Sequence, residues 1–197
     1  DVSGGMAKDV GGRSRLELAQ EALAAMIQEY DKLGDVNVKI IAFDDSVAIS
    51  TWYVGDTNAA SDFINGLVPG SGTWYDTALN AAIQDSASNL PPTADKSLIY
   101  FLSDGAPTSG HALDADVVYG GQTGQAAWEQ FVTDKADIAF AIGVGSGLSL
   151  TNLTPVAFPN TNSDQYAMLV TNETQLVNTL LATIDAGVAQ GSVSLLT

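Results

Sequence analysis

Three short stretches of the chain carry oxygen-bearing side chains at turn positions. Asp1 and Ser3 lie two residues apart in a glycine-rich turn, Thr73 stands in a later loop, and Asp104 follows an apolar run. Carboxylate and hydroxyl oxygens are hard ligands, which suit Mg²⁺, Ca²⁺ or Mn²⁺ better than zinc or copper. The sequence therefore predicts that Asp1, Ser3, Thr73 and Asp104 converge on one divalent cation.

The composition is that of a globular and strongly acidic chain. Its 197 residues suit one domain with a substantial core, and 46% of them are hydrophobic while 15% are charged. The net charge of −16 repels nucleic-acid phosphates and anionic membranes but attracts divalent cations. No apolar run is long enough to span a bilayer, and no signal peptide is visible.

Residues with nucleophilic or soft-ligand chemistry are scarce. The chain has no cysteine, which excludes disulfides, thiol catalysis and zinc–thiolate sites. Its single histidine, His111, lies in a polar loop between Gly110 and Ala112, where nothing supports a Ser-His-Asp triad. The composition thus favours a binding function over covalent catalysis.

Helical and strand patterns alternate along the chain. Ser14 and Glu17 form a predicted capping box at the start of a helix that Gly34 closes. Further helices are expected at 57–67, 75–87, 125–133 and 173–186, and strands at 36–43, 47–53, 97–102, 138–144 and 167–170. This alternation predicts an α/β fold: a doubly wound, mostly parallel sheet with one antiparallel edge strand (47–53) and helices on both faces.

The predicted sheet explains how distant residues would meet. Doubly wound sheets bind ligands at the carboxyl ends of their strands, where Asp104 would lie. Asp1 would lie there too if a strand preceded it, so either an apolar strand lies upstream or another segment fills that slot. We expect the upstream strand, with residues 1–190 forming the domain and 191–197 forming a tail or linker.

The order and spacing of the three stretches resemble a von Willebrand factor type A domain with a Rossmann-like fold. In that family a metal-ion-dependent adhesion site (MIDAS) combines an Asp-x-Ser-x-Ser turn, a later Thr and an Asp after the next central strand. The matching residues are Asp1, Ser3, Thr73 and Asp104. The resemblance implies a divalent cation, Mg²⁺ first and Ca²⁺ or Mn²⁺ as alternatives, with an open position for a partner's carboxylate.

Three segments look most like the copy of this domain in RTX repeat adhesins of Gram-negative bacteria. They are residues 13–19, 30–34 and 100–111. This resemblance implies type I secretion, an extracellular location at the bacterial cell surface, a role in biofilm adhesion, and flanking domains in one long chain. It fits an acidic chain without cysteine.

One position departs from the family pattern. Gly5 stands where the second serine of the turn usually ligates the ion, so one side-chain oxygen is lost. Water can replace that hydroxyl at a cost in affinity, because Mg²⁺ readily keeps water ligands. Gly5 and Trp74, which follows Thr73, are expected at the rim where a ligand would bind.

Other acidic pairs favour simpler interpretations. Asp114 and Asp116 could bind Ca²⁺, but a solvated loop is the more common role of such a pair. Asp44 and Asp45 are likewise interpreted as part of a turn rather than as a pair of metal ligands.

These residues are compatible with three functions, which they favour to different degrees. The first is a metal-dependent adhesion or protein-interaction module rather than an enzyme, with no nucleic-acid partner and no membrane insertion. The second is a structural domain that a metal stiffens within a long adhesin. The third, a Mg²⁺-dependent aspartate-based phosphatase, is disfavoured because Ser3 stands where a second acid is needed and no lysine has a suitable context.

Overall fold

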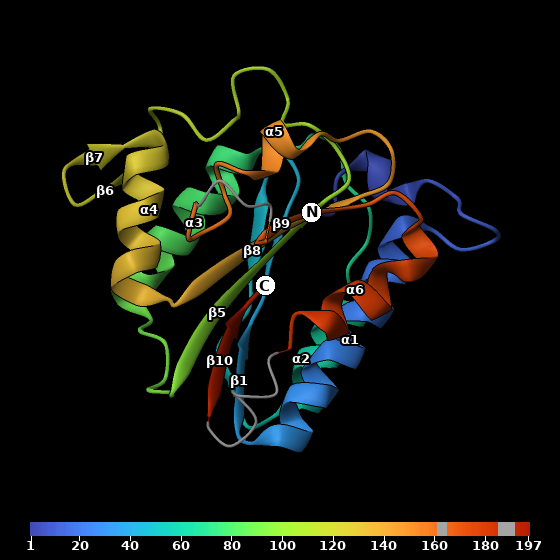
Figure 1. The fold of residues 1–197 in the computed structure, drawn as a ribbon, viewed down its shortest axis with the longest axis horizontal. Helices are drawn as coiled ribbons and strands as arrows, with labels where there is room; N and C mark the ends of the chain where they lie inside the picture. The colour runs from blue at the N-terminus through green and yellow to red at the C-terminus, as the bar shows by residue number, and fades with distance from the viewer. Residues whose placement is uncertain (161–164, 185–191) are drawn as a thin grey trace.

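A six-stranded sheet forms the centre of the molecule, with helices on both faces (Figure 1). The structure is a computed structural model that describes residues 1–160, 165–184 and 192–197. The strand order is β4-β1-β10-β5-β8-β9, and all neighbours are parallel except β4 and β1. The strands are β1 (Val36–Lys39), β4 (Tyr53–Val54), β5 (Lys96–Ser103), β8 (Ile138–Val144), β9 (Ala167–Val170) and β10 (Val193–Leu196). The predicted fold class is confirmed.

Two helical layers enclose the sheet and create two separate apolar cores. The helices α1 (Arg15–Leu33), α2 (Thr57–Asn65) and α6 (Leu176–Ala182) cover one face. The helices α3 (Tyr75–Ser88), α4 (Gly124–Lys135) and α5 (Leu150–Leu153) cover the other. Burial of both strand faces explains why the strands read as apolar runs rather than as alternating patterns.

The longest helix begins where the capping box predicts. The Ser14 hydroxyl accepts from the Glu17 main-chain nitrogen at 3.1 Å, and a Glu17 carboxylate oxygen accepts from the Ser14 nitrogen at 2.6 Å. Two otherwise unpaired donors of the first turn are satisfied in this way. The cap fixes the next residue, Arg15, at the first position of α1.

Several predicted elements are divided or reshaped. The predicted strand 36–43 is interrupted at Ile40 into β1 and β2 (Ile41–Phe43), and its return is divided into β3 (Val47–Ile49) and β4. A small hairpin, β6 (Val118–Tyr119) and β7 (Gln122–Thr123), lies where only a loop was expected. Short 3₁₀ turns, η1 (Gly4–Ala7) and η2 (Glu173–Gln175), complete the elements. The expected end of the last helix, near residue 186, and the boundary at 190/191 lie outside the described residues.

The largest difference concerns the end of the chain. Residues 193–196, expected to belong to a tail, instead form β10 in the middle of the sheet, parallel to both β1 and β5. Val193 and Leu195 are buried to within 2% exposure, as a central strand requires. β10 therefore fills the slot for which an upstream strand was expected, which is the alternative that the sequence left open.

The two ends of the described chain follow one another along this slot (Figure 1). Thr197 exchanges main-chain hydrogen bonds with Lys39 and Ile41, and the Val2 nitrogen donates to the Phe43 oxygen at 2.8 Å. An apolar cavity of about 70 Å³ lies between them and is lined from both helical layers, for example by Leu16 and Leu79. The Asp1 turn is thus aligned with a central strand, but that strand is β10 from the other end of the sequence rather than the expected upstream strand.

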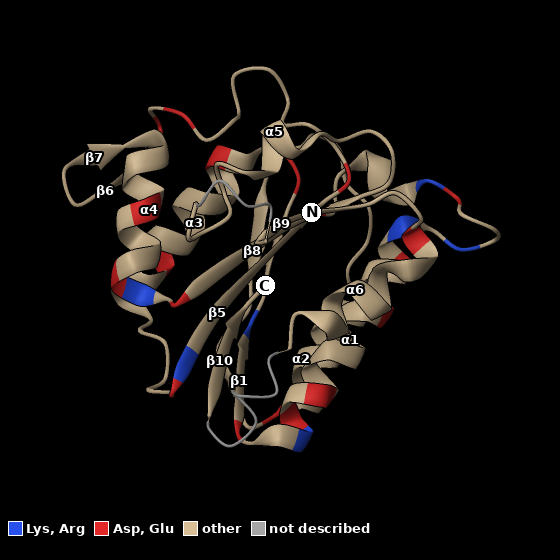
Figure 2. Cartoon of the chain, in the orientation of Figure 1, with Lys and Arg blue, Asp and Glu red and all other residues tan. Residues whose placement is uncertain are grey.

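Within the described residues, no helix has both the length and the apolar character needed to cross a membrane. Figure 2 shows Asp and Glu residues on the helices of both layers, with few Lys or Arg among them.

Candidate metal site

The Asp1 turn is held in place by the end of β5. The main-chain nitrogen of Asp1 donates to the Leu102 oxygen at 2.9 Å, and Ser103 Oγ donates to Asp1 Oδ2 at 2.5 Å. The other carboxylate oxygen of Asp1 accepts from the Ser3 nitrogen at 2.7 Å.

Ser3 and Asp104 meet although 101 residues separate them in sequence. Ser3 Oγ lies 3.4 Å from Asp104 Oδ1, and both residues are buried. Asp104 occupies the turn directly after β5, which is the predicted carboxyl end of a central strand. Two of the three stretches therefore converge through a direct side-chain contact.

The loop that carries Thr73 lies against the same turn. The Gly4 nitrogen donates to the Ser71 oxygen at 2.9 Å, so the two loops are joined through their main chains. A Cβ placed on Gly105 would lie 3.6 Å from Thr73 Oγ1, which puts the Thr73 hydroxyl beside the residue that follows Asp104. The structure thus brings Asp1, Ser3, Thr73 and Asp104 into one neighbourhood.

The two predicted rim residues have different surroundings. Trp74 is half-buried and stacks on His111 with ring centroids 3.8 Å apart. Gly5 is exposed, and a Cβ there would lie 2.4 Å from Asp104 Oδ2. The absent side chain at residue 5 is therefore what lets Asp104 adopt its position.

Arg15 is the functional residue that the sequence did not single out. Its Nη1 donates to Asp104 Oδ2 at 2.8 Å, and its Nε donates to Glu173 Oε1 at 3.0 Å. The Arg15 side chain is only 6% exposed. Asp104, the predicted ligand, is therefore already paired with a buried cation that the start of α1 supplies.

Tyr75 closes the site from the other helical layer. Its hydroxyl donates to the Gly105 oxygen at 2.9 Å. Burial raises the pKa of Tyr75 to about 12, and the Asp104 charge adds to this shift while the neighbouring Ser103 side chain opposes it. Tyr75 therefore remains protonated at neutral pH and fixes the turn that carries Asp104.

A second group of carboxylates joins the first turn of α3, which carries Asp76, to the loop that carries Asp114 and Asp116. Asp76, Asp114 and Asp116 each offer an oxygen within 4.8 Å of the others. His111 Nδ1 lies 3.1 Å from Asp76 Oδ2, and Asp116 is exposed. Asp116 is exposed and Asp114 is half-buried, and both lie in a loop as expected. Asp76 was not expected beside them because it lies 38 residues earlier than Asp114.

Asp44 and Asp45 form a turn that holds the Thr73 loop. The Ser71 hydroxyl donates to Asp45 Oδ2 at 2.5 Å, and the Trp74 nitrogen donates to the Asp44 main-chain oxygen at 3.1 Å. This pair has a positioning role, in agreement with the sequence-based interpretation of a turn.

The side chains present fit a hard divalent cation. Two carboxylates (Asp1, Asp104) and two hydroxyls (Ser3, Thr73) come from three loops, and none of these donors is a soft or a nitrogen ligand. Carboxylate neutralisation by such an ion would offset the repulsion between Asp1 and Asp104 in a buried setting.

Comparison with known proteins defines the family. The family model of the von Willebrand factor type A domain matches residues 1–106, more than half of the chain. The chain belongs to this family. A comparison with curated protein sequences gave no match.

Solved structures of other proteins share the fold. Proximal thread matrix protein 1 from the mussel byssus is 16% identical over 88% of this chain and 43% of its own, with a TM-score of 0.67. A von Willebrand factor type A protein from Catenulispora acidiphila is 19% identical over 92% of this chain and 39% of its own, also with a TM-score of 0.67. The pilus adhesin SpaC from Lactobacillus rhamnosus GG is 15% identical over 91% and 29%, with a TM-score of 0.65. The chain thus spans less than half of each of these proteins.

Proposed function

We propose that this domain is a metal-dependent interaction module of a bacterial surface adhesin. Asp1, Ser3, Thr73 and Asp104 would hold a divalent cation, Mg²⁺ first and Ca²⁺ or Mn²⁺ as alternatives. A carboxylate on a partner protein or other surface ligand would fill an open coordination position. Since a chain of net charge −16 repels anions, the cation would serve as the bridge between them.

The observation that carries this proposal is the contact between the Asp1 turn and Asp104. Ser3 Oγ and Asp104 Oδ1 lie 3.4 Å apart, while Ser103 ties Asp1 to the same strand end. Several oxygen donors that converge at one point are what hard cations bind.

Related structures add support. One structure of the mussel protein, 15% identical over 88% of this chain and with a TM-score of 0.66, is described as having a zinc-occupied MIDAS motif. The description of SpaC as a pilus adhesin supports an extracellular location and an adhesive role. The RTX adhesin context and the flanking domains rest on the sequence resemblance.

Metal binding is tested by titrating Mg²⁺ into the protein and following its thermal unfolding. We expect Mg²⁺ to raise the Tm of the parent, and we expect Asp104→Ala to abolish this rise because a carboxylate ligand is lost. Thr73→Val, which removes one hydroxyl and keeps the shape, should reduce the rise. The assignment fails if Asp104→Ala gains as much stability from Mg²⁺ as the parent. Loss of the rise in Asp114→Asn instead would locate the ion at the acidic loop.

The partner chemistry is tested by selecting short displayed peptides on the immobilised domain. Selection in Mg²⁺ should enrich peptides with Asp or Glu, and exchange of that residue for Asn or Gln should abolish binding. Binding should also be lost in chelator. If no magnesium-dependent peptide emerges while the Tm still rises with Mg²⁺, the metal only stiffens the fold, which is the spacer alternative.

A further inference from the structure

A buried arginine lies between two acidic residues from different parts of the chain. Arg15 contacts Asp104, at the end of β5, and Glu173, at the start of η2. The side chains of Asp104 and Glu173 are 2% and 12% exposed. Burying three charged groups is costly unless each one is paired, so this group has a fixed geometry.

Two glycines make room for this ion pair. A Cβ on Gly5 would lie 2.4 Å from Asp104 Oδ2, the same oxygen that accepts from Arg15. A Cβ on Gly145 would lie 2.1 Å from Arg15 Nη2, and Gly145 has a φ of 94° that disfavours other residues. Residues far apart in sequence therefore combine to hold the Arg15 guanidinium against the Asp104 carboxylate.

This arrangement opposes a divalent cation on electrostatic grounds. A metal ion bound through Asp104 would lie close to the guanidinium, since both would use one carboxylate. Like charges at such short range repel strongly where water is excluded. Part of the negative charge of Asp104 is moreover already neutralised by the charge-assisted bond to Arg15.

We propose that Arg15 is a built-in competitor of the divalent cation, which pairs with Asp104 in the metal-free protein and sets a low metal affinity. The inference rests on the proposed function, because it needs a cation at Asp104. Glu173 provides the second acceptor: Nε and Nη2 of Arg15 both lie 3.0 Å from Glu173 Oε1. The guanidinium therefore keeps a carboxylate partner when the ion takes Asp104.

The decisive variant is Arg15→Met combined with Glu173→Gln. It removes one positive and one negative charge, so the net charge is unchanged and only the competition for Asp104 is lost. We expect its Mg²⁺ dissociation constant, measured by calorimetry, to fall by at least about tenfold. Its Tm without metal is a second measurement, which shows that the variant is folded.

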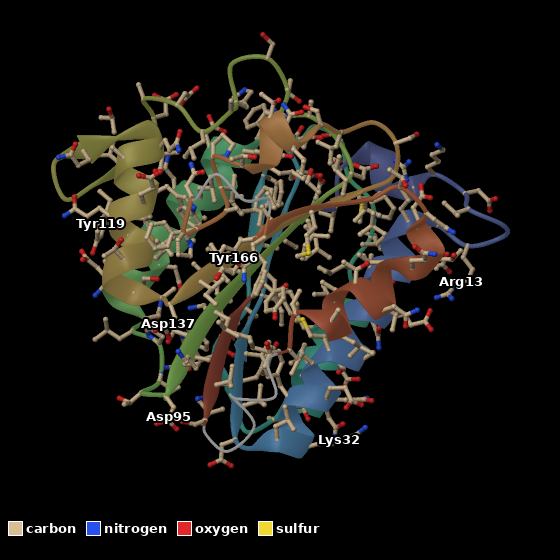
Figure 3. The ribbon with its side chains drawn as sticks, in the orientation of Figure 1. Arg13, Lys32, Asp95, Tyr119, Asp137 and Tyr166 are labelled. Carbon is tan, nitrogen blue, oxygen red and sulfur yellow. The ribbon has the colours of Figure 1, made fainter. Side chains whose placement is uncertain are left out.

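A second ion pair near the start of α1 provides a matched control. Arg13 and Glu21 form an exposed ion pair with side chains 47% and 51% exposed, and Figure 3 shows Arg13 at the outer edge of the molecule. Arg13→Met with Glu21→Gln makes the same change of charges away from Asp104. We expect its Mg²⁺ affinity to stay within about twofold of the parent, since solvent screens exposed pairs.

The outcomes separate the two proposals. If the parent binds Mg²⁺ and the Arg15/Glu173 variant binds it equally or less tightly, Arg15 only supports the fold and the competitor proposal is overturned. If neither protein binds Mg²⁺, Ca²⁺ or Mn²⁺, both proposals are overturned. Should the double variant fail to fold, Arg15→Gln removes the charge and keeps a donor, and the same gain in affinity is expected of it.

Discussion

Two groups of carboxylates lie on neighbouring loops, and they differ in what balances their charge. Asp1 and Asp104 are held by Ser103, Ser3 and Arg15, and the Asp104 side chain is 2% exposed. Asp114 and Asp116 instead belong to a solvated loop that meets Asp76 and His111. Water stabilises exposed carboxylates, whereas buried ones need fixed partners. The first group is therefore a defined structure, whereas in the second group only Asp76 is buried and has a fixed partner, His111, while Asp116 is exposed to water.

The strongest test of this contrast removes one carboxylate from each group. Asp104→Asn should lower the free energy of unfolding by about 3 kcal/mol in metal-free buffer, because Arg15 loses one of its two buried carboxylate partners. Asp114→Asn should change it by less than about 0.5 kcal/mol, as expected for a solvated loop. Urea unfolding of both variants measures the difference. If both variants lost the same free energy of unfolding, Asp104 would depend on fixed partners no more than Asp114 does.

A second test concerns the space that the Arg15 guanidinium occupies. Gly145→Ala should lower the free energy of unfolding by about 2 kcal/mol, because the new Cβ meets Arg15 and the φ of 94° becomes strained. Gly147 is the matched control, since a Cβ there would make only an ordinary 3.5 Å contact. Gly147→Ala should cost less than about 0.5 kcal/mol. A harmless Gly145→Ala would show that Arg15 is free to move aside.

The smallest expected effect is a pH dependence. Burial raises the pKa of Glu173, but hydrogen bonds from its own main chain and from Arg15, with the charges of Arg15 and Lys8, outweigh this and leave the pKa below its usual value. A lowered folded-state pKa adds stability above the unfolded pKa of about 4.5, which is lost as pH falls through the folded value. Between pH 6 and pH 3 the parent should therefore lose slightly more Tm than Glu173→Gln. A larger loss in the variant would contradict the sign of this shift.

Local signals in the sequence were sufficient to predict most elements, and they also singled out the four residues that are proposed as ligands. The capping box at Ser14, the apolar runs and the turn chemistry each depend on residues close together in the chain. Asp1 and Asp104 could be related because both are hard oxygen ligands at turn positions and both match the metal site of the von Willebrand factor type A domain. Such local signals are sufficient to predict the fold class, which the structure confirms.

The signals that failed involve partners far apart in the chain. Nothing in the sequence distinguishes Arg15 from the exposed Arg13, because the difference arises from Asp104 and Glu173, 89 and 158 residues away. Val193–Leu196 is too short for its sequence alone to predict a central strand. The available signals were its apolar residues and the absence of a strand before Asp1. The contact between Asp76 and His111 depends on the conformation of the loop after β5, which no local sequence pattern predicts.

The position of β10 has a consequence for how the protein is made. Its residues 193–196 pair with residues 36–39 and 96–99, so the middle of the sheet closes only after nearly all of the described chain has left the ribosome. Until then β1 and β5 present unpaired edges flanked by apolar side chains, a state that invites aggregation. Folding of this domain should therefore depend on chaperones until residues 193–196 are available to pair.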